Sequence, residues 1–436
     1  MALGTAGSSA QVTATSGGGG NYRGAFAMVT TLFFIWGFLT SLNDILIPHL
    51  KAIFDLNYAE VMLVQFVFFL AYAVFGFPAG KVVEWIGYQR TMVAGLLTMA
   101  LGAILFIPAA DLPSFPVFLL ALIFLGAGMA ALQVAANPYV AVLGPAQTAS
   151  SRLNLSQAFN SLGTTIGPPL GGYLILRSAE KIVENTSGMT PAALHAYRVH
   201  QAATVKFPYL IFTLVLVLLS LAIGLYKFPR IDTTKDFRPM KGGEKQTSIW
   251  RYRHVVLGAV GIFVYVGAEV SIGSFLINYF GQKDIAGLTA EAAAFYLPFY
   301  WGGAMIGRFI GSAVLQKVKT GKVVAFCAVV ATILVVTSML SFGHVALWSI
   351  LLVGLFNSIM FPSIFTLGIA EMGPLTGEAS GLLVTAIVGG AIIPEIQGVI
   401  ADRIGIHHAF ILPVLCYIFI AYYGLKGSRV ILPKGA

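Results

Sequence analysis

Charge is scarce in this chain, and that scarcity argues against a water-soluble globule. Only 10% of the 436 residues are Asp, Glu, Lys or Arg, whereas 58% are hydrophobic. Soluble globular domains carry about 25% charged residues. The sequence therefore has too few polar side chains to cover a water-facing surface of its size, and lipid must surround most of that surface.

Cysteines and catalytic motifs are also nearly absent. The two cysteines, Cys327 and Cys416, each lie in an apolar run, so they predict neither a disulfide framework nor a metal site. No HExxH sequence occurs, and the seven histidines fall in loops or at the ends of apolar stretches. No soluble stretch is long enough for a signalling domain. These absences argue against a membrane-embedded enzyme or a receptor that does not transport, and no cofactor is implied.

What the sequence does contain is a series of apolar stretches of about 20 residues, the length of a helix that crosses a ~30 Å hydrocarbon core. Backbone amides in that core must be bonded internally, which favours helices. We expect twelve spans, near residues 25–50, 60–83, 91–110, 115–143, 151–177, 206–228, 254–280, 292–316, 323–342, 345–370, 378–401 and 408–425.

The basic residues indicate how these spans are oriented. Most of the 26 Lys and Arg lie in alternate loops, on the side that also holds both termini. The positive-inside rule then places both termini in the cytoplasm. We interpret the net charge of +9 as this topological signal rather than as a nucleic-acid interface. A long loop on the outer side is expected to contain a short helix near 190–201.

The chain divides into two membrane halves. We expect an N-terminal six-helix half at 25–228 and a C-terminal six-helix half at 254–425, joined by a polar cytoplasmic linker at 229–253. Residues 1–24 and 426–436 are expected to form cytoplasmic tails. The first tail is rich in Gly, Ser and Thr, which predicts disorder.

The two halves repeat each other. Glycines, prolines and amide residues recur with the same local spacing at offsets of 224 to 230 residues. The matched pairs are Gly37 and Gly267, Gln133 and Asn357, Pro138 and Pro362, Gly163 and Gly389, Pro168 and Pro394, and Gly172 and Gly398. Parallel six-helix repeats are typical of the major facilitator architecture, in which the substrate site lies between the halves near the bilayer midplane.

Three carboxylates fall inside predicted spans, where a charge costs about 2.5–3.5 kcal/mol on insertion scales. They are Asp44, Glu269 and Glu395, and we predict that they couple transport to a cation. Structural alternatives stay open for each. Asp44 could serve only as a hydrogen-bonding group, Glu269, one turn after Tyr265, could pair with a basic residue, and Glu395 could pair with Arg308.

Neutral polar residues form a stripe along span five, which predicts the wall of an aqueous cavity. The stripe comprises Asn154, Gln157, Asn160, Ser161 and Thr164. Amides offer a donor and an acceptor together, as sugar hydroxyls require, and aromatic rings stack on the C–H faces of sugars. No basic cluster lines the expected cavity, which disfavours a phosphorylated solute. We predict substrate contacts from Trp36, Asn43, Gln133, Asn137, Gln157, Asn160, Tyr265, Trp301 and Asn357.

Four ordered sequence runs carry a resemblance to a known family. They are SLNDILIP at 41–48, AANPYV at 135–140, RLNLSQAFNS at 152–161 and FPSIF at 361–365. From about residue 25 to 425, the chain resembles the bacterial fucose–galactose–proton symporter family of the major facilitator superfamily. The resemblance implies an all-α integral membrane protein of two six-helix repeats that acts as a cation–hexose symporter in the cell inner membrane.

The resemblance also implies residue roles. The L-fucose symporter of this family uses an acid in span one, which maps onto Asp44, and an acid in span four, which maps onto Gln133 here. Its Gln in span seven is replaced by Glu269, while its polar pair in span five matches Gln157 and Asn160. Because an amide cannot take a proton, the acid has moved across the expected cavity. This departure favours the glucose/galactose branch, with fucose and N-acetylglucosamine as alternatives.

We therefore expect a monomeric secondary active transporter, not an enzyme, that imports a hexose with a cation by alternating access. A proton is favoured over sodium, and sodium coupling and uncoupled facilitation stay open. The expected partners are the sugar, the cation and the lipid bilayer. A degenerate form of the family's loop motif, at Gly80, Glu84, Gly87 and Arg90, implies a cytoplasmic gate between spans two and three.

Overall fold

Helices make up the regular structure of the described chain. The computed structural model describes residues 22–54, 56, 58–171, 190–229 and 248–431, and within these ranges it contains no β-strand. The predicted all-α class is confirmed. The predicted tail 1–24 and linker 229–253 lie largely outside the described residues, as does the end of the tail 426–436.

The N-terminal half follows the predicted order of spans. Its elements are α1 (Tyr22–Phe54), α2 (Tyr58–Asp111), α3 (Phe115–Val142), η1 (Ala146–Thr148), α4 (Ala149–Gly171), α5 (Pro191–Ala203) and α6 (Lys206–Leu225). Predicted spans two and three both lie in α2, which consists of two helices that meet at a non-helical kink at Gly87 with a φ of 81°. That conformation favours glycine because it has no Cβ. The short helix expected near 190–201 is confirmed as α5.

The C-terminal half is more interrupted. It consists of η3 (Ile249–Arg251), α7 (Arg253–Phe280), α8 (Ala290–Ala294), α9 (Leu297–Val314), α10 (Thr320–Leu340), α11 (Gly343–Asn357), α12 (Met360–Gly368), η4 (Gly373–Leu375), α13 (Thr376–Thr385), η5 (Ala386–Val388), α14 (Gly389–Ile404), α15 (Ile406–Ala409), α16 (Ile411–Tyr422) and η6 (Tyr423–Gly427). Predicted span ten is broken between α11 and α12, and span eleven at η5. Broken membrane helices are common at transporter binding sites.

Apolar length alone identifies most of the spans. Among the described residues, nine helical segments are long and apolar enough to cross a membrane, and one of them, Leu63–Asp111, contains two predicted spans. The other two predicted spans are α4 and α9. They are less apolar because α4 carries the polar stripe and α9 carries Arg308.

Glycine contacts reproduce the predicted duplication in space. A Cβ on Gly163 of α4 would collide with the Phe34 carbonyl of α1, and a Cβ on Gly389 of α14 would collide with the Phe263 carbonyl of α7. In each half, therefore, the first and fifth spans cross at a glycine that lets the backbones touch, as small residues do in lipid.

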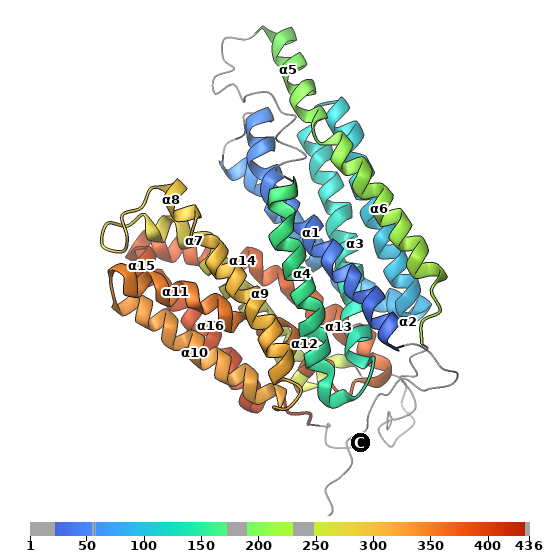
Figure 1. Ribbon diagram of the computed structural model, residues 1–436, viewed down its shortest axis with the longest axis vertical. Helices are drawn as coiled ribbons and strands as arrows, with labels where there is room; N and C mark the ends of the chain where they lie inside the picture. Colours follow the sequence, from blue (N-terminus) through green and yellow to red (C-terminus); the bar gives the residue numbers. More distant parts are fainter. Residues whose placement is uncertain (1–21, 55, 57, 172–189, 230–247, 432–436) are drawn as a thin grey trace, which may run out of the picture.

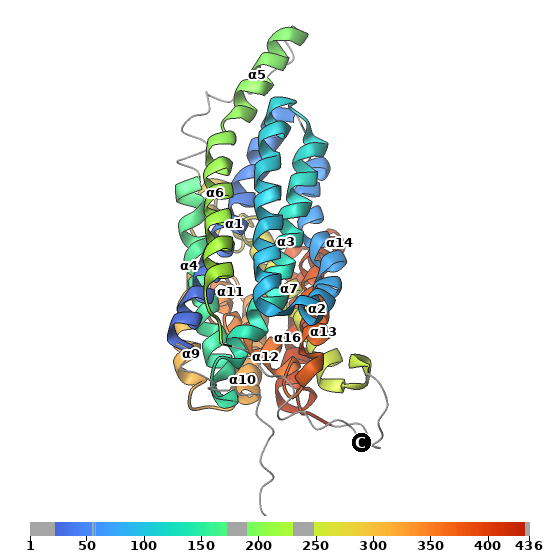
Figure 2. The same ribbon diagram turned by 90° about the vertical axis from the view of Figure 1, so that its right-hand side faces the viewer.

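The two halves meet at one end of the molecule. At the lower end in Figure 1, α13 contacts α2 and α3, and α4 contacts α9 and α12 (Figures 1 and 2). The backbones touch there, since a Cβ on Gly80 would lie 2.6 Å from the Gly377 carbonyl oxygen. Toward the other end, the ribbons of the halves diverge in Figure 1.

We expect Gly389→Ala to destabilise the protein, although alanine is the better helix former. The added methyl group must displace the Phe263 carbonyl, and overpacking of this kind costs about 1–3 kcal/mol. The measurement is thermal unfolding of purified protein in detergent. Gly302→Ala in α9 is the matched control, because its Cβ would meet no atom within 4 Å. Equal stability of the two variants would contradict the predicted close crossing.

Candidate functional site

Glu269 lies near the middle of α7 and is half-buried. Tyr265, one turn earlier and fully buried, donates its hydroxyl to Oε1 of Glu269 at 2.7 Å. The two side chains therefore share one face of the helix, as the sequence indicated. No ion pair among the described side chains includes Glu269, so the structure gives its carboxylate a hydrogen-bond donor and no cation at ion-pair distance.

A second tyrosine anchors the backbone at the same position. Tyr300 of α9 donates its hydroxyl to the Glu269 carbonyl oxygen at 3.2 Å and accepts a bond from Nδ2 of Asn357 at 2.8 Å. Tyr300 and Asn357 are fully buried. The end of α11 is thus connected through α9 to the helix that carries the carboxylate.

The N-terminal half contains the counterpart of this amide–tyrosine pair. Nε2 of Gln133 in α3 donates to the Tyr72 hydroxyl of α2 at 3.0 Å. Gln133 and Asn357 are one of the pairs matched by sequence, and Tyr72 precedes Tyr300 by a similar offset. The duplication therefore extends from glycine packing to the polar groups between the second and fourth spans of each half.

Pro138 exposes a carbonyl oxygen inside α3. Proline has no N–H, so the carbonyl four residues earlier loses its helical partner. That carbonyl belongs to Val134, and Ser380 of α13 donates its hydroxyl to it at 3.0 Å. A residue of the C-terminal half thus supplies the hydrogen bond that the proline removes from a helix of the N-terminal half.

Pro362, the partner of Pro138 in the repeat, exposes the Ser358 carbonyl in the same way. Nε of Arg308 donates to this carbonyl at 3.2 Å. One terminal nitrogen of Arg308 donates to the Ser161 hydroxyl, and it also lies 3.5 Å from the Gln157 carbonyl of α4. Arg308 is therefore bonded within its own half and across to the other.

The residues of the polar stripe on α4 form hydrogen bonds to three different neighbouring helices. Asn154 donates to the Ser150 carbonyl at 2.8 Å and to Ser363 of α12 at 3.3 Å. Asn160 donates to the Phe33 carbonyl of α1 at 2.9 Å, whereas Gln157 and Ser161 meet α9. In the described region, no bond joins the stripe to Gln133 or to the other predicted amide of span four. The stripe thus contributes to helix packing as well as to the candidate site.

Two of the amides predicted to contact the substrate are buried and have hydrogen-bonding atoms without a partner in the described structure. Asn137 is completely buried, and neither its Nδ2 nor its Oδ1 has a partner in the described structure. Oδ1 of Asn357 is likewise without a partner. Leaving such a group unsatisfied costs about 1–3 kcal/mol, so a bound solute that reached these atoms would gain free energy.

The remaining predicted site residues lie in different surroundings. The Trp36 side chain is 5% exposed and stacks on Phe33 at a centroid distance of 4.4 Å, whereas Trp301 is 43% exposed. Glu395 is exposed on α14, and no ion pair joins it to Arg308. The predicted side chains at positions 43 and 44 fall outside the described part of α1.

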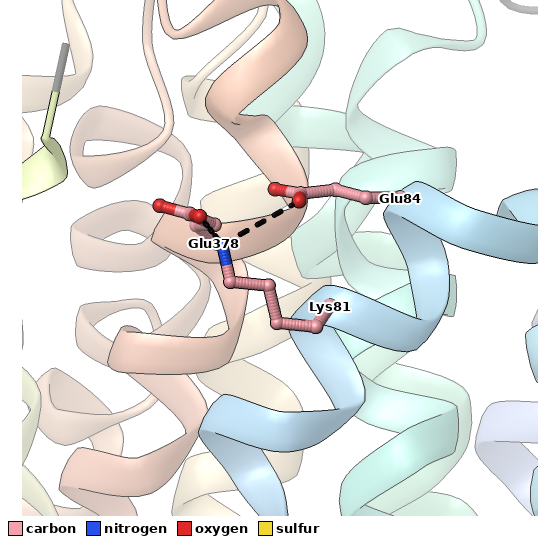
Figure 3. Close-up of polar contacts among 3 residues, drawn as sticks. All are labelled: Lys81, Glu84 and Glu378. Carbon is pink, nitrogen blue, oxygen red and sulfur yellow. Dashed lines mark ion pairs between the residues drawn. The ribbon is translucent and has the colours of Figure 1, made fainter. Parts of the chain in front are cut away.

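Lys81 lies between two carboxylates at the end where the halves meet (Figure 3). It forms an ion pair with Glu378 of α13 in the other half and lies 3.7 Å from Glu84, one turn away on α2. The sequence motif included Glu84 but missed Lys81 and Glu378. Only the packing of α2 on α13 brings them together.

Hydroxyl groups form a second set of contacts between the two halves, and we call the whole contact region between the halves the seam. Ser151 of α4 donates to the Ser312 carbonyl of α9 at 2.6 Å, and Ser150 lies 2.6 Å from the Thr366 hydroxyl of α12. These side chains are buried. The seam between the halves thus includes buried polar groups that water can solvate when the halves separate.

The whole arrangement matches known membrane transporters. The Major Facilitator Superfamily model matches residues 28–394. The chain belongs to this superfamily. It is 51% identical to a protein named glucose/galactose transporter from Brucella abortus, over 94% of this chain and 95% of that one. It is 35% identical to the L-fucose-proton symporter of Escherichia coli, over 93% of each.

A solved structure gives the same result for the fold. A crystal structure of a major facilitator transporter, FucP, in the outward conformation superposes with a TM-score of 0.84 at 34% identity, covering 94% of this chain and all of that one. Membership confirms the predicted fold of twelve membrane helices in two repeats and the family that the sequence runs resembled. The named relatives are transporters, in agreement with the prediction that this superfamily member is not an enzyme.

Proposed function

We propose that this major facilitator protein imports a hexose, glucose or galactose in preference to fucose or N-acetylglucosamine, together with a proton. The names of its relatives support the sugar and the proton. The observation that carries the proposal is Glu269, a half-buried carboxylate in the middle of a membrane helix, bonded to Tyr265 and not ion-paired among the described side chains. A carboxylate in that setting can change its charge by binding a cation, whereas the amide at Gln133 cannot.

The sugar would bind between the N-terminal half (25–228) and the C-terminal half (254–425). There it would contact amides that have hydrogen-bonding atoms without a partner in the described structure. Asn137 and Asn357 each have buried polar atoms without a partner. Hydroxyl groups of a sugar can donate to and accept from an amide. Asp44 in α1 and Glu395 in α14 are further candidates for cation coupling.

The closed end of the molecule would face the cytoplasm. The similarity to a transporter in the outward conformation supports this assignment, as does the excess of basic residues on the side of both termini. The protein would then be a monomer in the cell inner membrane, with its site open to the outside and its hydroxyl and ion-pair seam closed.

Sugar counterflow in proteoliposomes tests the proposed function. Vesicles loaded with unlabelled glucose, galactose, fucose or N-acetylglucosamine are diluted into a trace of the same labelled sugar, and uptake of the label is measured. Accumulation of each sugar is then measured under a proton gradient or a sodium gradient. We expect counterflow with glucose or galactose and accumulation driven by the proton gradient. Accumulation with sodium alone would identify the other cation, and counterflow without any gradient-driven accumulation would identify a facilitator. No counterflow with any hexose would reject the proposal.

We expect Gln157→Ala to weaken sugar binding about ten- to a hundredfold, the factor for a lost hydrogen bond of roughly 1–3 kcal/mol. The Gln157 side chain, although 4% exposed, makes no hydrogen bond to another described residue, so its truncation should lower thermal stability only through lost packing. Asn160→Ala is the contrasting variant. It removes the bond to the Phe33 carbonyl, so it should lower thermal stability. Unchanged sugar affinity in Gln157→Ala would exclude Gln157 from the binding site.

A further inference from the structure

Trp301 of α9 is 43% exposed, and its place in the helix shows which way it faces. Met305, Arg308 and Ser312 follow it at helical spacing, so these side chains form one row along α9. All three contact α4 of the other half, which packs on α9 (Figure 1). Trp301, the first member of the row, therefore faces the N-terminal half rather than lipid.

The contacts along this row loosen toward Trp301. At the closed end, Ser312 donates its hydroxyl to the Ser151 carbonyl at 3.0 Å. Further along, the Met305 sulfur lies 3.9 Å from the Thr165 hydroxyl, in an exposed contact. Trp301 lies one helical turn further from the closed end, so its indole is at the open edge of the seam.

Gly273 of α7 allows the indole to lie directly against the helix backbone. A Cβ on Gly273 would lie 2.9 Å from Cζ2 and 3.6 Å from Cη2 of Trp301, whereas carbon atoms pack best about 3.5–4.0 Å apart. The Tyr300 ring also contacts the indole edge to face, with centroids 5.1 Å apart. Any side chain at position 273 would therefore move the indole from this place.

The same place adjoins the carboxylate of the candidate site. Gly273 follows Glu269 by one helical turn, so the two residues share a face of α7. Tyr300, which contacts the indole with its ring, donates its hydroxyl to the Glu269 carbonyl oxygen. An exposed aromatic ring and a half-buried carboxylate thus lie on neighbouring turns of one helix face.

An exposed indole beside a carboxylate is suited to binding a sugar. The C–H groups of a pyranose ring pack on an aromatic face, while its hydroxyl groups bond to polar groups around it. In galactose, the axial hydroxyl on C4 leaves the C–H groups of C3, C4 and C5 together on one face. In glucose these C–H groups are divided between the two faces. An aromatic platform therefore favours galactose.

We propose that Gly273 is a positioning residue, which fixes the Trp301 indole as a platform for the apolar face of a pyranose, galactose above all. The inference rests on the proposed function and specifies its sugar. Because position 273 has no side chain, the indole lies against α7 and leaves its exposed part to the sugar. A sugar stacked there would lie close to the turn that carries Glu269, which brings the two coupled solutes together.

Equilibrium binding of labelled galactose and glucose to the purified protein tests the platform. Trp301→Phe keeps an aromatic face, and Trp301→Leu removes it while keeping an apolar side chain. We expect Trp301→Leu to weaken galactose binding on the order of tenfold, glucose binding less, and Trp301→Phe to weaken both less than Trp301→Leu does. Parent affinity in Trp301→Leu, or an equal loss for the two sugars, would overturn the platform.

Gly273→Ala tests the positioning role. The methyl group displaces the indole, so we expect weaker galactose binding and a changed quenching of tryptophan fluorescence by acrylamide, even without sugar. Gly302→Ala is the matched control, because it lies next to Trp301 and its Cβ would meet no atom within 4 Å. This control should bind galactose and be quenched as the parent is.

A double variant isolates the contact between the two positions. In Trp301→Phe the shorter ring no longer reaches position 273, so adding Gly273→Ala should change neither galactose binding nor quenching. An undiminished effect in that background, or no effect in the parent, would overturn the positioning role. If Gly273→Ala alone does not fold, a folded double variant would support the contact, and a double variant that also fails to fold would overturn it.

The two proposals fail in distinguishable ways. Quenching needs no sugar, so the expected quenching pattern without counterflow of any hexose would reject the proposed transport and the platform, and retain the placement of the indole by Gly273. Normal counterflow, with galactose binding that ignores Trp301→Leu, would reject the platform and retain the proposed transport.

Discussion

Replacing Glu269 by glutamine is expected to abolish uphill accumulation of sugar while most counterflow persists. The amide can still accept the hydrogen bond from Tyr265, which lies 2.7 Å from the present carboxylate oxygen, so the local geometry should survive. The amide cannot change its charge, however, and coupling needs a group whose charge changes with the ion. The measurements are proton-driven sugar accumulation in vesicles and the alkalinisation that accompanies uptake.

A second substitution tests whether the acid has moved within the cavity. The double variant Glu269→Gln/Gln133→Glu restores an acid at the position where the related L-fucose symporter has one. The Tyr72 hydroxyl, which now accepts from Gln133, can donate to the new carboxylate instead. We expect partial recovery of coupled uptake. Coupled uptake by Glu269→Gln at the parent rate would exclude a role for Glu269 in coupling.

Two other carboxylates provide comparisons for this experiment. Asp44→Asn is expected to lose accumulation as well, because the family resemblance assigns a coupling acid to that position. Glu395 is exposed and bound by no described cation. Loss of accumulation in Glu395→Gln alone, with Glu269→Gln unaffected, would assign the coupling site to α14.

Reversing the charge of Lys81 is expected to open the closed end and to reduce transport at least tenfold. Lys81→Glu would place three carboxylates together, because Glu84 and Glu378 already flank this position (Figure 3). The Glu378 side chain is only 15% exposed. Loss of its partner should therefore cost more than the 0.2–1 kcal/mol of an exposed pair and less than the 3–5 kcal/mol of a buried one. About 1.4 kcal/mol is enough for a tenfold shift between states.

The measurement is the rate at which a maleimide labels Ser312→Cys, together with sugar counterflow. Ser312 is 5% exposed in the closed seam, so faster labelling reports opening of the seam. The charge swap Lys81→Glu/Glu378→Lys should slow labelling and recover transport, since it re-forms an ion pair across the same seam. Lys206→Glu is the control. It breaks the ion pair with Asp111, which lies within the N-terminal half, and should leave labelling unchanged. If Lys81→Glu labels at the parent rate, the ion pair does not hold the seam.

Proline positions indicate part of the site from the amino-acid sequence alone. Pro138 and Pro362 each remove an N–H, so a carbonyl four residues earlier needs another donor. The sequence therefore contains the information that Val134 and Ser358 need partners inside the membrane. It does not indicate that Ser380 and Arg308 supply them, because the donors come from helices far away in the chain.

Asn160 illustrates a different limit. Its spacing placed it with Gln157 and Ser161 on a polar stripe, and stripe residues were expected to face a cavity. The glycine at position 37 lets α1 approach so closely that a Cβ there would collide with Asn160, and the amide then bonds to the Phe33 carbonyl. Periodicity gives the angular position of a side chain on its own helix, not how near the neighbouring helix comes.

The amino-acid sequence alone is enough to predict the membrane environment, the succession of spans and the duplication, because each depends on local properties of the chain. Apolar length decides what crosses lipid, and the offset between repeats is visible in any pair of matched glycines or prolines. Which charges meet, in contrast, depends on how the helices pack. Lys81 pairs with Glu378 and Arg308 reaches Ser161 because helices of opposite halves come into contact, and the energy of a charge at membrane depth depends on those neighbours rather than on its place in the sequence.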